Sequence, residues 1–177
     1  MVTTSDTGAD PAAGTTESLV LHRAGSGPGT WSMGSLFEHL VAAHQTDGLL
    51  GMSLVTQPPG IATPLHRHRH EAEAMFLLEG RMTYRAGEEV VELSDGDFVY
   101  LPKALPHAFR IRGDKPARLL ALTVPGGLMG LYDEVGVPAT EMRLPGDDGP
   151  TMPEEIARWN EVGPRYGLEV VGPPIPE

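Results

Sequence analysis

The feature that most constrains this chain is a repeated pattern that begins after Gly60. Short apolar or alternating runs are each ended, after about ten residues, by a turn signal such as Glu79-Gly80 or Asp95-Gly96. Further runs of this kind precede Gly60. Short strands at this spacing are typical of antiparallel barrels and sandwiches. The pattern therefore predicts an all-β antiparallel fold, and a small jelly-roll barrel is its natural closure.

One stretch of this pattern, from Gly60 to Gly80, carries the residues of a metal site. His66, His68 and Glu73 offer nitrogen and oxygen donors of the kind that bind divalent first-row metals. A fourth donor, His107, opens a later apolar strand. We expect the two segments to converge on one ion, with these four residues as its ligands.

Side-chain alternation restricts how the donors can meet. His66 and His68 point to the same face of an extended strand, whereas Glu73 lies an odd number of residues from both and would point away. A bend or bulge is therefore expected in the polar run 69–72. His70 lies in that bend and is expected to be exposed or to lie beside the ligands. The alternative, a charged loop with surface histidines, does not account for the order of the two glycine-framed segments.

The first segment resembles the first conserved motif of the cupin family. That motif has a glycine, five residues, His-x-His, four residues, a glutamate, six residues and a glycine. The matching positions here are Gly60, His66, His68, Glu73 and Gly80.

The second segment resembles the second cupin motif. Gly96, Pro102 and His107 fit it, while Ala104 stands where the family usually has glycine. Ile111 stands where the family often has asparagine. The wider run 31–139 is similar to the single-domain cupins that resemble quercetin dioxygenases.

This resemblance implies a cupin-type antiparallel jelly-roll barrel with short C-terminal helices, and one divalent transition metal ion as cofactor. The donor set suits Fe, Mn, Ni, Co, Cu and Zn alike. In the quercetin dioxygenases, a metal-bound enolate of a flavonol or related polyphenol reacts with dioxygen. The resemblance implies that the glutamate ligand, here Glu73, also takes the substrate proton. Two alternative functions remain. One is a non-redox cyclase, isomerase or lyase with the same fold and metal site, and the other is a metal-dependent protein that only binds a small molecule.

Large apolar side chains of the strands and of the segment after Pro125 are candidates for the wall of a substrate cavity. Methionine and aromatic side chains accommodate flat apolar ligands. The candidates are Met75, Phe98, Tyr100, Phe109, Met129 and Tyr132. Trp31 and Trp159 lie nearer the ends, where we expect them to pack the flanking segments.

The chain divides into three parts. Residues 1–17 are small and polar, and they are expected to form a disordered tail. Residues 18–125 should form the cupin barrel. Residues 126–177 should form a C-terminal helical extension and a proline-rich tail, in which 126–139 covers the barrel mouth.

Two segments near the start have less certain patterns. Residues 18–25 alternate well enough for an edge strand, and an open apolar edge there would favour a homodimer. Residues 34–44 have apolar side chains at helical spacing, although the cupin resemblance implies a strand. We expect a strand there.

Composition limits the partners. The chain has no cysteine, which excludes disulfides and thiolate metal ligands. Its formal net charge of -11 argues against nucleic acid and against an anionic membrane surface. The sequence shows no membrane span and no signal peptide, so we expect a cytoplasmic protein with a small-molecule substrate, and dioxygen as a second reactant of the dioxygenase.

Overall fold

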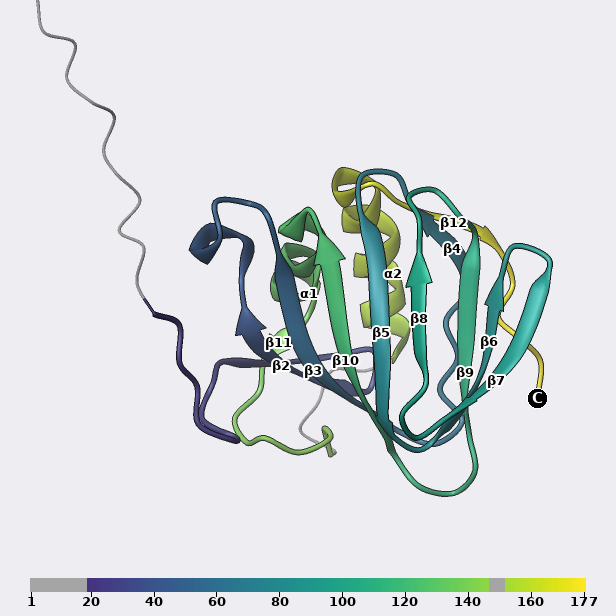
Figure 1. Ribbon diagram of the computed structural model, residues 1–177, viewed down its shortest axis with the longest axis horizontal. Coiled ribbons are helices and arrows are strands. Elements are labelled where there is room, and N and C mark those ends of the chain that lie inside the picture. The colour runs from purple at the N-terminus through teal and green to yellow at the C-terminus, as the bar shows by residue number, and fades with distance from the viewer. Residues whose placement is uncertain (1–18, 147–151) are drawn as a thin grey trace, which may run out of the picture.

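The computed structural model describes residues 19–146 and 152–177, which form two antiparallel sheets with two short α-helices in the C-terminal part (Figure 1). The expected tail at residues 1–17 lies outside the described part. The first strands are β1 (Gly29–Ser32), β2 (Ser35–Val41), β3 (Gly51–Gln57), β4 (Leu65–His68), β5 (Ala72–Glu79) and β6 (Arg81–Ala86). The later strands are β7 (Glu89–Ser94), β8 (Phe98–Leu101), β9 (His107–Arg112), β10 (Ala117–Val124), β11 (Val137–Pro138) and β12 (Leu168–Gly172).

The larger sheet has the strand order β11-β1-β2-β3-β10-β5-β8, and the smaller sheet has the order β12-β4-β9-β6-β7. Neighbouring strands in both sheets run antiparallel. Strands far apart in the sequence, such as β3 and β10, therefore lie side by side. The expectation of an all-β antiparallel fold is confirmed.

The core lies between the two sheets because the central strands have one apolar face. Along β3, β5 and β10 buried and less buried residues alternate, as expected for strands with one face toward a core. Ala121 lies opposite Ser53 on one side and opposite Met75 on the other, so the inward faces of three strands are in register. The buried cluster includes Phe37, Val55, Met75, Leu77, Leu119 and Ala121 from the larger sheet, and Met82, Tyr84, Phe109 and Ile111 from the smaller one.

Two strands were expected in the N-terminal part, and the structure contains one of them. Residues 19–28 form no strand, and Leu19 and Leu21 are exposed, so the edge strand expected at 18–25 is not found. The reason is that β11 occupies the position next to β1, at the edge of the larger sheet. The ambiguous segment 34–44 forms β2, as expected.

The C-terminal part contains helices and also completes both sheets. The helices α1 (Met129–Val135) and α2 (Met152–Val162) are accompanied by the 3-10 segments η2 (Gly126–Leu128) and η3 (Gly163–Tyr166), and a further one, η1 (Ala43–Gln45), follows β2. A second apolar cluster joins α1, α2 and β12 through Leu128, Leu131, Val135, Val162 and Leu168. Because β12 pairs with β4, the final segment lies directly against the strand that carries His66 and His68.

The proline-rich end is fixed by two arginines of β9. Arg110 Nε donates to the carbonyl oxygen of Ile175 at 2.8 Å, and Arg112 Nη2 donates to that of Pro176 at 3.4 Å. Within the described residues, no helix is long and apolar enough to cross a membrane.

Candidate metal centre

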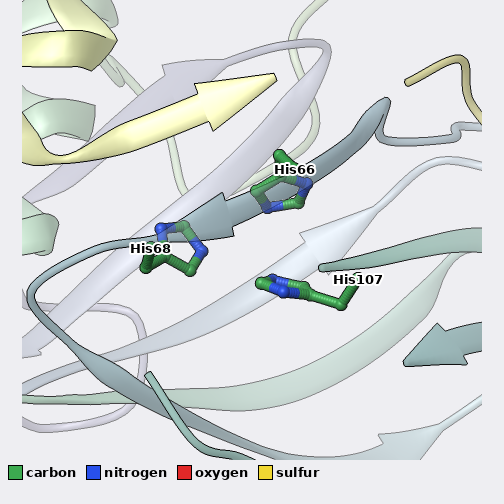
Figure 2. A group of neighbouring side chains, drawn as sticks. All are labelled: His66, His68 and His107. Carbon is green, nitrogen blue, oxygen red and sulfur yellow. The ribbon is translucent and has the colours of Figure 1, made fainter. Parts of the chain in front are cut away.

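Three histidines meet in the interior between the sheets. His66 and His68 come from β4 and His107 from the start of β9, where His66 and His107 are directly opposite each other. Each offers a ring nitrogen, and these nitrogens all lie within 4.8 Å of one another. Figure 2 shows the three rings turned toward a common centre. All three side chains are buried.

Glu73 joins this cluster from β5 in the other sheet. Its Oε2 lies 3.1 Å from His107 Nε2 and 3.3 Å from His68 Nε2. The chain reaches this position through a bend at Arg69 and His70, as the alternation of side chains requires. His70 is exposed and lies outside the cluster.

Backbone carbonyls fix the orientation of two of the rings. His66 Nδ1 lies 2.8 Å from the carbonyl oxygen of Pro64, and His107 Nδ1 lies 2.9 Å from that of Leu105. A carbonyl only accepts, so each Nδ1 carries the proton and each Nε2 keeps a lone pair. This is the tautomer in which a histidine can bind a metal through Nε2.

The turn before β9 contains Ala104, the alanine at the position where the second motif usually has glycine. Ala104 adopts a left-handed φ of 63°, which is a conformation that favours glycine. Its N–H donates to the carbonyl oxygen of His68 at 2.8 Å. The turn thus ties the segment before His107 to the end of β4 even though alanine replaces glycine.

The buried atoms of the cluster fit a cation. His68 Nδ1, His107 Nε2 and Glu73 Oε2 are buried, and none of them has a hydrogen-bond partner besides the short contacts of Glu73 with the two rings. Buried polar atoms are rarely left unpaired in proteins unless an ion or a functional role accounts for them. Histidine nitrogens and a carboxylate are suitable ligands for a divalent transition metal.

Electrostatics support the same interpretation. Burial lowers the pKa of His66 to about 3, with help from the neighbouring His107 and His68, so this ring stays neutral. Burial alone would raise the pKa of Glu73, but its contacts with His107 and His68 outweigh burial and hold the pKa well below its usual range. Burial would lower the pKa of His107, yet Glu73 raises it overall.

A cavity of about 450 Å³ adjoins the cluster. His66 and Glu73 form part of its wall, and the rest is mostly apolar. Of the residues that we expected in this wall, Met75, Phe109 and Tyr132 line the cavity. The volume lies within the range of roughly 300–1,000 Å³ that is usual for small-molecule sites.

Phe98 and Tyr100 do not line this cavity. Phe98 lies opposite Phe76, and Tyr100 opposite Ala74, whereas Val99 lies opposite the inward-facing Met75. Directly opposite residues share a face of an antiparallel sheet, so Phe98 and Tyr100 are on the outer face, where they are 58% and 62% exposed. The expectation that they contact the substrate is corrected.

Met129 is buried beside the cavity and does not form its wall. Its sulfur lies 3.6 Å from Ser53 Oγ, and its side chain fills the space next to Gly51. It therefore packs α1 against β3.

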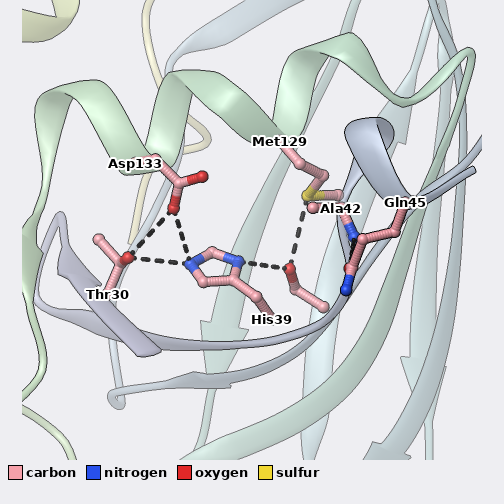
Figure 3. A network of polar contacts seen from close by, with 7 residues as sticks. Thr30, His39, Ala42, Gln45, Met129 and Asp133 are labelled. Atoms are coloured by element: carbon pink, nitrogen blue, oxygen red, sulfur yellow. Dashed lines mark hydrogen bonds and ion pairs between the residues drawn. The ribbon is translucent and has the colours of Figure 1, made fainter. Parts of the chain in front are cut away.

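A polar network holds α1 in place near the cavity (Figure 3). His39 Nε2 lies 2.9 Å from Thr30 Oγ1 and 3.1 Å from the carboxylate of Asp133, and its Nδ1 lies 3.2 Å from Ser53 Oγ. Burial lowers the pKa of His39, against the raising effect of Asp133. His39 in β2 thus connects three strands to α1, the helix that carries Tyr132.

Sequence reasoning missed the contribution of α2 to this wall. Met152, Ile156 and Trp159 are spaced at i, i+4 and i+7, which identifies one apolar side of a helix, and all three line the cavity. The sequence shows this spacing, but the spacing does not reveal which part of the protein the apolar side of the helix contacts. The segment 126–139, expected to cover the mouth, contributes only Tyr132 to the wall.

Residues 53–123 match the sequence profile of the cupin domain. The chain therefore contains a cupin domain and has the cupin fold, with two antiparallel sheets and two short C-terminal helices.

Two curated proteins show how far the sequence similarity extends. The chain is 29% identical over 112 residues to quercetin 2,3-dioxygenase of Bacillus subtilis, which covers 63% of this chain and 32% of that protein. It is 34% identical over 68 residues to an uncharacterized protein of Methanocaldococcus jannaschii, covering 38% of this chain and 54% of the relative. The chain thus spans about a third and about half of these relatives' lengths.

Among solved structures, a predicted oxalate decarboxylase from Thermotoga maritima matches with a TM-score of 0.51 and 20% identity. The match covers 56% of this chain and 92% of that one. At 20% identity, this match supports a similarity of fold and nothing more.

Proposed function

We propose that this protein is a metal-dependent cupin enzyme, a dioxygenase that acts on a flavonol or a related polyphenolic enol. The observation that carries the proposal is the buried cluster of His66, His68, His107 and Glu73 at the wall of an apolar cavity. The similarity to a quercetin 2,3-dioxygenase supports the choice of substrate class.

The four residues would hold one divalent ion of the series Fe, Mn, Ni, Co, Cu or Zn. The ion would supply Lewis acidity, which favours the deprotonated form of an enol or phenol oxygen, and a redox-capable metal would also support reaction with dioxygen. His66 and His107 are oriented for this role by the carbonyls of Pro64 and Leu105.

Glu73 is placed to handle the substrate proton. It lines the cavity, and it is the one carboxylate among the described residues of the cavity wall. The apolar wall excludes water from the region where a substrate anion would otherwise be reprotonated. We propose that Glu73 both binds the ion and accepts the enol proton.

The test compares turnover of quercetin under air and under nitrogen. Wild-type protein loaded with a redox-capable metal should consume dioxygen only when quercetin is present. Glu73→Gln should reduce kcat more than quercetin affinity, while Glu79→Gln, an exposed glutamate of the same strand β5, should behave like wild type.

Two results would reject the dioxygenase. One is product formation that continues undiminished under nitrogen, and the other is a product with the mass of the substrate. Either result would favour a cyclase, isomerase or lyase that uses the same site, and binding without any turnover would favour a binding protein.

A further inference from the structure

Three aromatic side chains form a continuous part of the cavity wall. Phe37 of β2 stacks on Tyr132 of α1 with ring centroids 4.1 Å apart and planes at 29°. Trp159 of α2 meets Tyr132 edge to face at 5.4 Å. All three line the cavity that also contacts His66 and Glu73. They lie outside residues 53–123, so the segments that flank the matched region supply this part of the wall.

Only one of the two polar groups in this aromatic wall is already paired. The indole N–H of Trp159 donates to Ser32 Oγ at 3.1 Å. The hydroxyl of Tyr132 has no hydrogen bond within the described residues, although its ring lines the cavity. Burial raises the pKa of Tyr132, and the negative charge of Glu73 raises it further, so the hydroxyl keeps its proton at neutral pH. It is therefore a free donor near the cluster.

The wall contains no cationic side chain to receive an anionic ligand. No lysine or arginine is among the described residues that line the cavity, and Glu73 is the charged group of the wall. Carboxylate and phosphate ligands are usually held by arginine or lysine, and a buried charge without a partner is costly. Apart from the atom that binds the ion, the cavity therefore suits an uncharged ligand with a flat apolar body.

We propose that Tyr132 is a specificity-determining binding residue: its hydroxyl donates a hydrogen bond to an oxygen of an uncharged, flat aromatic ligand held at the ion. This inference rests on the proposed function for the presence of the ion and the ligand at this site. It does not depend on the reaction with dioxygen.

Tyr132→Phe tests the hydroxyl alone, because phenylalanine retains the ring and its contacts with Phe37 and Trp159. The affinity of quercetin for the metal-loaded protein is measured under nitrogen by quenching of tryptophan fluorescence, since Trp159 lies in the wall. Loss of one hydrogen bond should weaken quercetin binding about threefold to tenfold. Metal content, measured by elemental analysis, should stay at the wild-type value.

Tyr84→Phe is the matched control. Tyr84 is 1% exposed, its hydroxyl is buried without a hydrogen-bond partner, and burial followed by the charge of Glu73 also raises its pKa. It does not line the cavity. Removing its hydroxyl should leave quercetin affinity unchanged, so an equal loss in both variants would assign the effect to Glu73 rather than to contact with the ligand.

The outcomes separate this inference from the proposed reaction. If quercetin binds and Tyr132→Phe weakens it, the inference stands even when no dioxygen is consumed. Unchanged affinity in Tyr132→Phe at full metal content would overturn it, whatever the activity. Salicylate, an anionic aromatic chelator, should bind more weakly than quercetin, and either the reverse order or no quercetin binding to wild type would overturn the ligand class.

Discussion

Acidification should weaken metal binding by no more than about a hundredfold per pH unit, although three histidines surround the proposed ion. An ion must displace any proton that its ligands hold, and each displaced proton changes the affinity tenfold per pH unit, about 1.36 kcal/mol. The number of protons displaced therefore reports the protonation of the cluster before the metal enters.

The structure limits that number. With a pKa of about 3, His66 is protonated in only about 0.3% of molecules at pH 5.5, so it competes negligibly. Glu73 is already ionised, because its pKa is held below its usual range. His107, whose pKa is raised, holds a proton below that pKa, so affinity falls as the pH drops through it and recovers fully above it. At most two histidines can then release a proton.

The assay is a competition between metal-free protein and a chromogenic chelator for Zn²⁺ or Co²⁺, from pH 7.5 to 5.5 at constant ionic strength. The chelator's own pH dependence is subtracted. Calorimetric titrations in buffers of different ionisation enthalpy count the protons released per ion. A slope near three, or a thousandfold loss of affinity per pH unit, would refute the reasoning and show that His66 is basic in the folded protein.

Four further expectations concern the site and the fold. His107→Ala should lose most of its metal while staying folded, and full stoichiometric metal in that variant would contradict the ligand assignment. Ala104→Gly should raise the free energy of unfolding by about 0.5–1 kcal/mol, because glycine relieves the left-handed conformation; a loss in chemical denaturation would contradict this. Glu155→Ala should lower the stability by about 1–3 kcal/mol, because its Oε1 accepts from the N–H of Met33 at 2.7 Å and the variant leaves that donor unpaired; an unchanged melting temperature would count against it. We also propose a homodimer through the exposed apolar outer face of β5 and β8, so Phe98→Glu should shift the mass in sedimentation to that of a monomer, and a monomeric wild type would reject the interface.

The sequence by itself determined the part of the site that depends on local rules. The spacing of His66, His68 and Glu73, together with the two-residue period of a strand, required a bend before Glu73, and the structure has a bend there. Turn residues at regular intervals predicted the strands from Gly60 onward, and the cupin resemblance brought His107 to the same centre. These features are local because they follow from the conformation of a few consecutive residues.

Other features depend on pairing between distant segments, which alternation cannot supply. Phe98 and Tyr100 alternate with Val99 and Leu101 in the sequence, and only the register of β8 against β5 decides which pair faces inward. Residues 18–25 also show alternating apolar and polar side chains, but they form no strand. The free edge of β1 pairs instead with β11, which follows α1. A strand forms where a partner is available, and the partner is chosen by the whole fold.

The cavity is the clearest case of what only the tertiary structure decided. Phe37, Tyr132 and Trp159 belong to a strand and two helices that are far apart in the sequence, and no spacing relates them. They meet because His39 connects β2 to Asp133 of α1, and because Glu155 of α2 binds the backbone at Met33. The metal ligands could be found from a motif, whereas the wall that would recognise a substrate exists only where separate elements pack together.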